Sequence, residues 1–183
     1  YRAAKLKFFR AVANFSKKPR KLFFLNREDL NHGYFADAVS GVGEVYYFGR
    51  DEFIETRLSR GRVSIGDWLA NDFNLENAAA ATRFAEILGI DWETIKAALR
   101  SFPGVPGRLD VIQEEPIRIV IDYAHTPDSL EKVYQVLAKS AHKNKAKNQK
   151  LICVLGAAGG GRDRWKRPIL GKLAARYCQK VIL

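Results

Sequence analysis

The chain has 183 residues, of which 47% are hydrophobic and 28% charged, and its formal net charge is +11. This hydrophobic content excludes a disordered chain, and no apolar run approaches the roughly 20 residues that a membrane-spanning helix needs. The length allows either one large core or two domains of about 100 residues each.

The first part of the chain alternates between helical and extended patterns. The predicted elements are a helix at 1–15, strands at 22–25 and 44–48, a candidate strand at 63–69, a helix at 74–88 and a second helix that begins after Asp91. Gly89 is the residue type preferred after a helix end, and Asp91 is a good N-cap for the next helix. The apolar faces of the first and last of these helices should be buried; their residues are Leu6, Phe9, Val12 and Ala13, then Ile95, Ala98 and Leu99.

A cluster of prolines and glycines at 103–107 interrupts every pattern before it, so we place a domain boundary between residues 106 and 107. The elements predicted beyond it are strands at 109–112 and 117–121, a helix at 127–140, a strand at 151–155, a helix at 168–178 and the start of a strand at 181. Strands that alternate with helices predict an α/β fold with a doubly wound parallel sheet.

One strand in this second part ends in an unusual group of polar side chains. Residues 117–121 suit a buried parallel strand, and Thr126 suits the N-cap of the helix that follows. Asp122, Tyr123 and His125 therefore lie at the carboxyl end of a strand, where open α/β sheets bind ligands. The alternative is that Asp122 and His125 only satisfy backbone groups in a tight turn.

The net charge of +11 raises a different class of function, the binding of nucleic acid. The basic residues lie in two separate loops, around 10–21 and 143–150, without the interleaved aromatics of a nucleic-acid module. We therefore expect no nucleic-acid partner. The two cysteines, Cys153 in a predicted buried strand and Cys178 late in a helix, have no metal-site spacing and favour a reducing compartment.

Several motifs, in order along the chain, resemble those of the Mur ligase family. They are Tyr1-Arg2-Ala3-Ala4-Lys5, Phe73-Asn74-Leu75-Glu76-Asn77-Ala78-Ala79-Ala80, Gly104-Val105-Pro106-Gly107-Arg108-Leu109, and Asp122-Tyr123-Ala124-His125-Thr126-Pro127-Asp128 with the later Gly161-Arg162-Asp163-Arg164. The sequence at 122–127 is most similar to the corresponding motif of the ligases that add the third amino acid of the peptidoglycan stem peptide (MurE type). The resemblance implies that residues 1–106 are the later part of a P-loop-type central ATPase domain. It implies that 107–183 are the first part of a Rossmann-like C-terminal (glutamate ligase) domain.

The resemblance also implies an activity. The ligase would use ATP and Mg²⁺ to join UDP-N-acetylmuramoyl-dipeptide to a free amino acid, diaminopimelate or lysine, through an acyl phosphate. It would act as a monomer in the cytoplasm. No phosphate-binding P-loop occurs in these residues, and the chain begins without Met, so we expect a fragment that is inactive alone. The alternatives are another Mur-type or folylpolyglutamate synthase-like ligase and, in a different class, a basic nucleic-acid-binding module.

Several residues receive roles from the resemblance. Lys5 would carry a carbamate that supplies an oxygen ligand to Mg²⁺. Without the resemblance, a lysine at this place on a helix is interpreted as a solvated side chain. Asn74 and Asn77 would contact adenine, although Asn74 also suits a helix cap. Arg108 would meet phosphate or ribose oxygens of ATP, and its alternative is a salt bridge across the hinge.

At the strand end, Asp122 would accept ribose hydroxyls and Tyr123 and His125 would pack near adenine. Arg162 would hold a carboxylate of the incoming amino acid, although Gly161 stands where the family commonly has Asp, and Trp165 stands where Gly is common. These departures leave the amino-acid specificity open.

Overall fold

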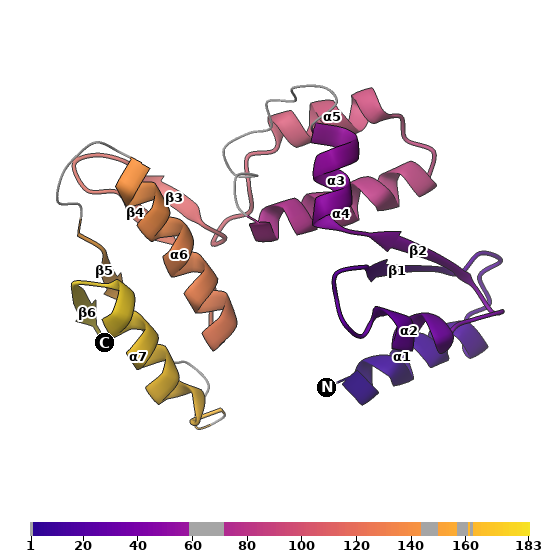
Figure 1. Cartoon of the computed structure of the whole chain (residues 1–183), viewed down its shortest axis with the longest axis horizontal. Coiled ribbons are helices and arrows are strands. Elements are labelled where there is room, and N and C mark those ends of the chain that lie inside the picture. The colour runs from indigo at the N-terminus through magenta and orange to yellow at the C-terminus, as the bar shows by residue number, and fades with distance from the viewer. Residues whose placement is uncertain (1, 59–71, 144–149, 157–160, 162) are drawn as a thin grey trace. The chain divides into compact units, whose positions relative to one another are not determined.

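The computed structural model describes residues 2–58, 72–143, 150–156, 161 and 163–183, without the side chains of 72 and 140–143. The chain divides into two compact units, Tyr1–Pro103 and Gly104–Leu183, each with its own apolar packing (Figure 1). The predicted strand at 63–69 and the predicted site residue Arg162 lie outside the described residues.

The first unit combines a small parallel sheet with several helices. Its elements are α1 (Arg2–Phe15), β1 (Leu22–Asn26), α2 (His32–Asp37), β2 (Glu44–Phe48), α3 (Arg50–Phe53), the π-helix η1 (Ile54–Leu58), α4 (Asp72–Ile87) and α5 (Trp92–Ser101). Strands β1 and β2 pair in parallel, with Leu22 opposite Glu44 and Asn26 opposite Phe48. Residues 31–43, for which the sequence pattern predicts no element, contain the short helix α2.

Two separate apolar clusters stabilise this unit. Ala13 of α1 packs with Phe23 of β1 and Val39, and Phe9 and Val12 join them from the same face of α1. The second cluster joins α3, α4 and α5 through Phe53, Ala78, Ala79, Ile95 and Leu99. The predicted inward faces of the first and last helices are thus confirmed, except that Ala98 is exposed.

The ends of the helices in this unit follow local side-chain chemistry. The Asp91 carboxylate accepts a hydrogen bond from the Thr94 backbone N–H at 2.9 Å, which confirms the predicted N-cap of α5. Gly89 follows the end of α4 with a φ of +84°, a conformation that side-chain-bearing residues rarely adopt. The helix begins at Asp72, so the interpretation of Asn74 as its N-cap is wrong.

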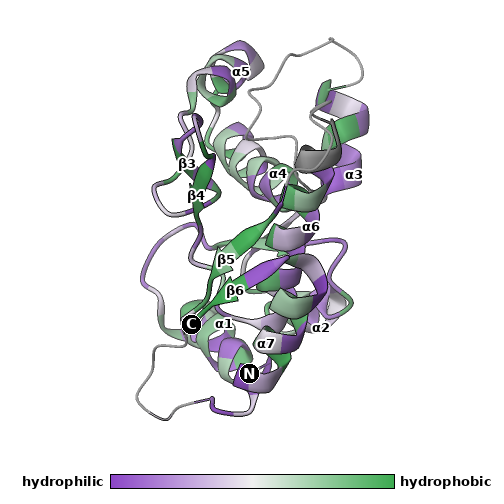
Figure 2. Cartoon of the chain, turned by 90° about the vertical axis from the view of Figure 1, so that its left-hand side faces the viewer, coloured by the Kyte–Doolittle hydropathy of each residue, from purple (hydrophilic) through white to green (hydrophobic). Residues whose placement is uncertain are grey.

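The second unit contains β3 (Asp110–Gln113), β4 (Ile119–Ile121), α6 (Pro127–Lys143), β5 (Ile152–Val154), α7 (Lys166–Tyr177) and β6 (Lys180–Ile182). Strands β5 and β6 are parallel, as predicted. Strand β4, however, pairs antiparallel with β3, so the prediction that it belongs to a parallel sheet is wrong for this pair. It is also not buried, because Ile119 and Ile121 are exposed; Figure 2 shows this strand as hydrophobic.

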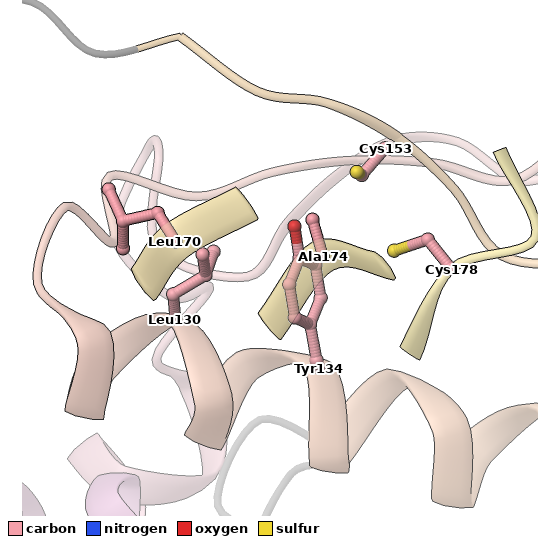
Figure 3. Packing of buried hydrophobic residues seen from close by; sticks show 6 residues of the cluster. All are labelled: Leu130, Tyr134, Cys153, Leu170, Ala174 and Cys178. Atoms are coloured by element: carbon pink, nitrogen blue, oxygen red, sulfur yellow. The ribbon is translucent and has the colours of Figure 1, made fainter. Parts of the chain in front are cut away.

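Helices α6 and α7 pack together and against β5, as Figure 3 shows for the residues at the centre of this core. The buried members are Leu130, Tyr134, Cys153, Leu170, Ala174 and Cys178. Cys153 lies in a buried strand as predicted, whereas Cys178 follows the last residue of α7 rather than lying within it. Burial raises the pKa of the Cys178 thiol to about 12, so this thiol is protonated at neutral pH.

The described part of the chain contains no helix that is long and apolar enough to cross a membrane.

Candidate nucleotide site

The carboxylate of Asp122, directly after β4, joins two segments of the second unit. One of its oxygens accepts a hydrogen bond from the Leu109 backbone N–H at 2.8 Å, and the other accepts one from the Ala124 N–H at 2.7 Å. Asp122 is half-buried. Asp122 therefore does satisfy backbone groups in a turn, which was the alternative interpretation. Each of its carboxylate oxygens can still accept a further hydrogen bond.

The turn at 107–109 is held from both sides. The Gly107 N–H donates to the carboxylate of Asp110 at 3.0 Å, and its carbonyl accepts from the Tyr123 N–H at 2.9 Å. Gly107 has a φ of +72° and Leu109 a φ of +46°, which is uncommon for a residue with a branched side chain. The turn is thus held by hydrogen bonds with Asp110, which follows it directly, and with Tyr123 beyond β4.

Three exposed side chains form one surface beside this turn. The guanidinium carbon of Arg108 lies 5.2 Å from the centroid of the Tyr123 ring. The rings of Tyr123 and His125 meet edge to face, with centroids 5.3 Å apart. Tyr123 is 67% exposed, so its ring is available to a ligand. A planar cation beside two rings suits a nucleotide, whose base stacks on aromatic faces and whose phosphates attract guanidinium.

Helix α6 begins directly after this surface. The Thr126 hydroxyl accepts a hydrogen bond from the Ser129 backbone N–H at 3.3 Å, and the Thr126 N–H donates to the Ser129 hydroxyl at 3.1 Å. The predicted N-cap is confirmed, and the reciprocal bonds resemble a capping box. This cap fixes the direction in which the chain leaves His125.

The structure therefore brings together Arg108, Asp122, Tyr123 and His125. Within this unit, the guanidinium of Arg108 contacts the Tyr123 ring. Asp110 supports this group through its hydrogen bond with Gly107, although the sequence pattern did not predict it. The available signal was its position three residues after Gly107, within reach of that glycine's amide.

Three other predicted residues belong to the first unit. Asn74 and Asn77 lie in the first two turns of α4, where Asn74 is half-buried and Asn77 exposed. Lys5 is exposed on α1. Hydrogen bonds from Asn31 hold the pKa of Asp29 below its usual value of 3.8, and the charge of Lys5 lowers it further.

The predicted metal and amino-acid sites are less complete than the nucleotide surface. Among the described residues, no group of three His, Cys, Asp or Glu side chains is arranged to hold a metal ion. Arg162 lies outside them, and its neighbour Gly161 has a φ of +112°.

With this geometry in view, comparison with known proteins identifies the family. Residues 107–183 match the family described as Mur ligase, glutamate ligase domain. The chain belongs to the Mur ligase family, and its homologues are of the MurE type.

Two relatives illustrate how much of such a protein this chain represents. UDP-N-acetylmuramyl-tripeptide synthetase of Roseiflexus sp. is 32% identical over 206 aligned residues, which take in 100% of this chain and 39% of that protein. UDP-N-acetylmuramoyl-L-alanyl-D-glutamate–2,6-diaminopimelate ligase of Trichormus variabilis is 45% identical over 118 residues, which cover 63% of this chain and 22% of that protein. The chain thus spans about two fifths or less of the length of these relatives.

A solved structure shows the same fold. MurF from Acinetobacter baumannii superposes with a TM-score of 0.69 over 98% of this chain and 41% of that protein, at 22% identity. At this identity the likeness shows the fold alone.

Proposed function

We propose that the chain forms part of an ATP-dependent ligase that adds the third amino acid to UDP-N-acetylmuramoyl-dipeptide. The observation that carries this proposal is the surface of Arg108, Tyr123 and His125 at the end of β4. It lies within the residues that match the glutamate ligase domain, and relatives of this chain carry the names of tripeptide synthetase and diaminopimelate ligase. The surface has the chemistry that a nucleotide requires.

Each residue of this surface has a distinct proposed role. The Arg108 guanidinium binds phosphate or ribose oxygens, for which its planar fork is suited. Asp122 accepts a ribose hydroxyl with the lone pairs that its two backbone hydrogen bonds leave available. Tyr123 and His125 stack near the adenine. Asn74 and Asn77 offer amide donors and acceptors to the base edge.

The proposed metal ligand is Lys5, carried as a carbamate. Lys5 is exposed on α1 and therefore accessible to carbon dioxide. A carbamate would replace the ammonium with an anionic oxygen ligand of the kind that Mg²⁺ prefers. When bound, Mg²⁺ would stabilise charge on the transferring phosphoryl group.

The reaction supported by these roles is amide formation through an acyl phosphate. The substrate carboxylate attacks the γ-phosphate and ADP leaves; the amine of the amino acid then displaces phosphate. The residues of this chain contribute binding and orientation of ATP, and positioning of this kind supplies much of phosphoryl-transfer catalysis. Arg162 is proposed to hold the carboxylate of the incoming amino acid.

The test is a phosphate-release assay on the complete ligase that includes these residues. Phosphate release should require ATP, Mg²⁺, UDP-N-acetylmuramoyl-dipeptide and one amino acid together, with diaminopimelate and lysine supplied separately. Activity with a folate and glutamate in place of the uridine nucleotide would contradict the proposal and favour a folylpolyglutamate synthase-like ligase. Salt-dependent binding to nucleic acid without phosphate release would favour the basic binding module.

A further inference from the structure

The backbone on both sides of Arg108 is tied to a carboxylate. Its predecessor Gly107 donates its N–H to Asp110 at 3.0 Å, and its successor Leu109 donates its N–H to Asp122 at 2.8 Å. The Arg108 N–H itself donates to the Val105 carbonyl at 3.0 Å. Three consecutive amides of this turn are therefore occupied by the protein's own acceptors.

This arrangement has a consequence for anion binding. Consecutive backbone amides in a turn often form a concave site for phosphate, but these three face acceptors within the chain. A hydrogen bond from this turn to a phosphate must therefore come from the Arg108 side chain. The turn contributes by fixing the position of the Arg108 Cα.

We propose that Asp110 is a positioning residue for Arg108, which acts on ATP only through that arginine. The proposal rests on the proposed function, because it assigns to Arg108 the contact with ATP. Of the two carboxylates that hold the turn, Asp122 also belongs to the nucleotide surface, whereas Asp110 makes its contact at Gly107, on the other side of Arg108 in the chain. Asp110 begins β3, opposite Ile121 of β4, so the paired strands fix its backbone.

The physical reason is preorganisation. Gly107 has a φ of +72°, and a glycine in an unrestrained turn samples many conformations. A hydrogen bond from its amide to a carboxylate restricts that freedom before ATP binds, so less conformational entropy is lost in the complex. Without Asp110, Arg108 would retain its chemistry but would occupy the correct position for a smaller fraction of the time.

The test compares four variants of the complete ligase in the ATP dependence of phosphate release. Asp110→Ala removes the acceptor and should raise the KM for ATP about 3- to 10-fold, with kcat changed by less than about twofold. Asp110→Asn retains an oxygen acceptor and should restore the KM to within about twofold of the wild type. Arg108→Ala should raise the KM for ATP about tenfold or more. Glu114→Ala, a control in the same hairpin with an exposed ion pair to Arg118, should leave the KM unchanged.

The decisive measurement is the double variant Arg108→Ala with Asp110→Ala. If Asp110 acts through Arg108, the second substitution should change the KM for ATP by less than about 1.5-fold in the Arg108→Ala background. The same fold-increase in both backgrounds would overturn the proposal and assign Asp110 a general structural role. An unchanged KM for ATP in Asp110→Ala, together with a raised KM in Arg108→Ala, would also overturn this proposal. That result would leave the proposed function intact.

The failure of the proposed function has a different signature. It would appear as no ATP-dependent phosphate release by the wild type with any substrate set, or as an Arg108→Ala variant with an unaltered KM for ATP. Melting temperatures of all the variants, measured in parallel, identify any that fail to fold. Should Asp110→Ala fail to fold, Asp110→Ser, with a shorter hydroxyl acceptor, takes its place. Its KM for ATP should lie between those of Asp110→Asn and Arg108→Ala.

Discussion

The two units present their predicted nucleotide residues in different ways. In the second unit, Tyr123 contacts both Arg108 and His125, and Asp122 ties their segments together through two backbone hydrogen bonds. In the first unit, Lys5 and Asn77 are exposed side chains on separate helices. The difference teaches that one ligand can be bound in two ways. In the second unit, folding alone brings the binding residues together, whereas in the first unit the side chains would make their contacts only when the ligand is bound. Substitutions of Asp122 in the second unit should therefore affect stability as well as activity, and substitutions of Lys5 and Asn77 in the first unit should affect activity alone.

The largest effect is expected from the exposed lysine. Lys5→Ala in the complete ligase should lower kcat by about 100-fold or more, because loss of a ligand to the phosphoryl-stabilising metal ion costs several kcal/mol. Its melting temperature should not change, since the side chain is exposed. Phosphate release measured with and without added formate should show partial rescue, because formate supplies an oxygen ligand. Lys7→Ala, an exposed lysine on the same helix, is the control; normal activity of Lys5→Ala without formate would make Lys5 a surface lysine only.

Arg162→Lys extends the comparison to the amino-acid substrate. An ammonium cannot reproduce a bidentate pair with a carboxylate, and losing such a contact costs about 2–5 kcal/mol. The kcat/KM for the amino acid should therefore fall roughly 30-fold or more while the KM for ATP stays near normal. Steady-state kinetics in both substrates provide the measurement, with Arg164→Lys as the control. A lower melting temperature with intact amino-acid kinetics would show that Arg162 only supports its loop.

Asp122→Ala should combine both kinds of effect. It leaves the Leu109 and Ala124 amides without their acceptor and removes the proposed ribose contact. We expect the KM for ATP to rise about tenfold, the KM for the amino acid to change much less, and the melting temperature to fall by several degrees. Thermal melts and ATP titrations on one preparation provide the test. An unchanged KM for ATP in a folded variant would leave Asp122 with its turn-holding role alone.

A smaller and purely functional effect is expected for the exposed amide of α4. Asn77→Ala should raise the KM for ATP a few-fold, the loss of about one hydrogen bond to the base, and should leave the melting temperature unchanged. Competition with GTP sharpens the measurement, because loss of a base-edge contact should narrow the preference for ATP. If the nucleotide preference is identical in the variant and the wild type, Asn77 does not contact the base.

The smallest effect on activity is expected at the N-cap of α5. Asp91→Ala should lower the melting temperature by a few degrees without changing the KM for ATP, because Asp91 caps this helix through Thr94. Bonds from the Thr94 amide and hydroxyl lower the pKa of Asp91 below its usual 3.8. The stabilisation is therefore present above about pH 4 and disappears as the pH falls through the lowered pKa. Melts from pH 7 to pH 3 should show the two proteins converging at the acidic end, and a constant difference throughout would contradict this account.

Much of the local structure followed from the sequence. The strand at 44–48 has the bounds that were predicted, and the caps at Asp91 and Thr126 formed as expected, because capping depends on neighbouring residues alone. The exposure of Ile119 and Ile121 could not be foreseen, because an apolar β-branched run does not reveal whether its strand will be covered on both faces.

The pairing partner of a strand is likewise a long-range property. The direction of β4 against β3 depends on the tight connection between them, and the sequence pattern of alternating strands and helices favoured a parallel sheet instead. For the site, the sequence placed Asp122, Tyr123 and His125 at a strand end. It did not reveal that Leu109 and Gly107 would be tied to that end, because such contacts depend on the fold between them.

The core of the second unit has a practical consequence for following this protein in solution. Both cysteines, Cys153 and Cys178, are buried, and the pKa of about 12 keeps the Cys178 thiol in its unreactive protonated form. Maleimide reagents at pH 7 should therefore not react with the Cys178 thiol but should label cysteines introduced at exposed positions. A fluorophore placed at Lys7 and another at Lys132 would then report the distance between the two units as ATP is added, without removal of any natural side chain from the core.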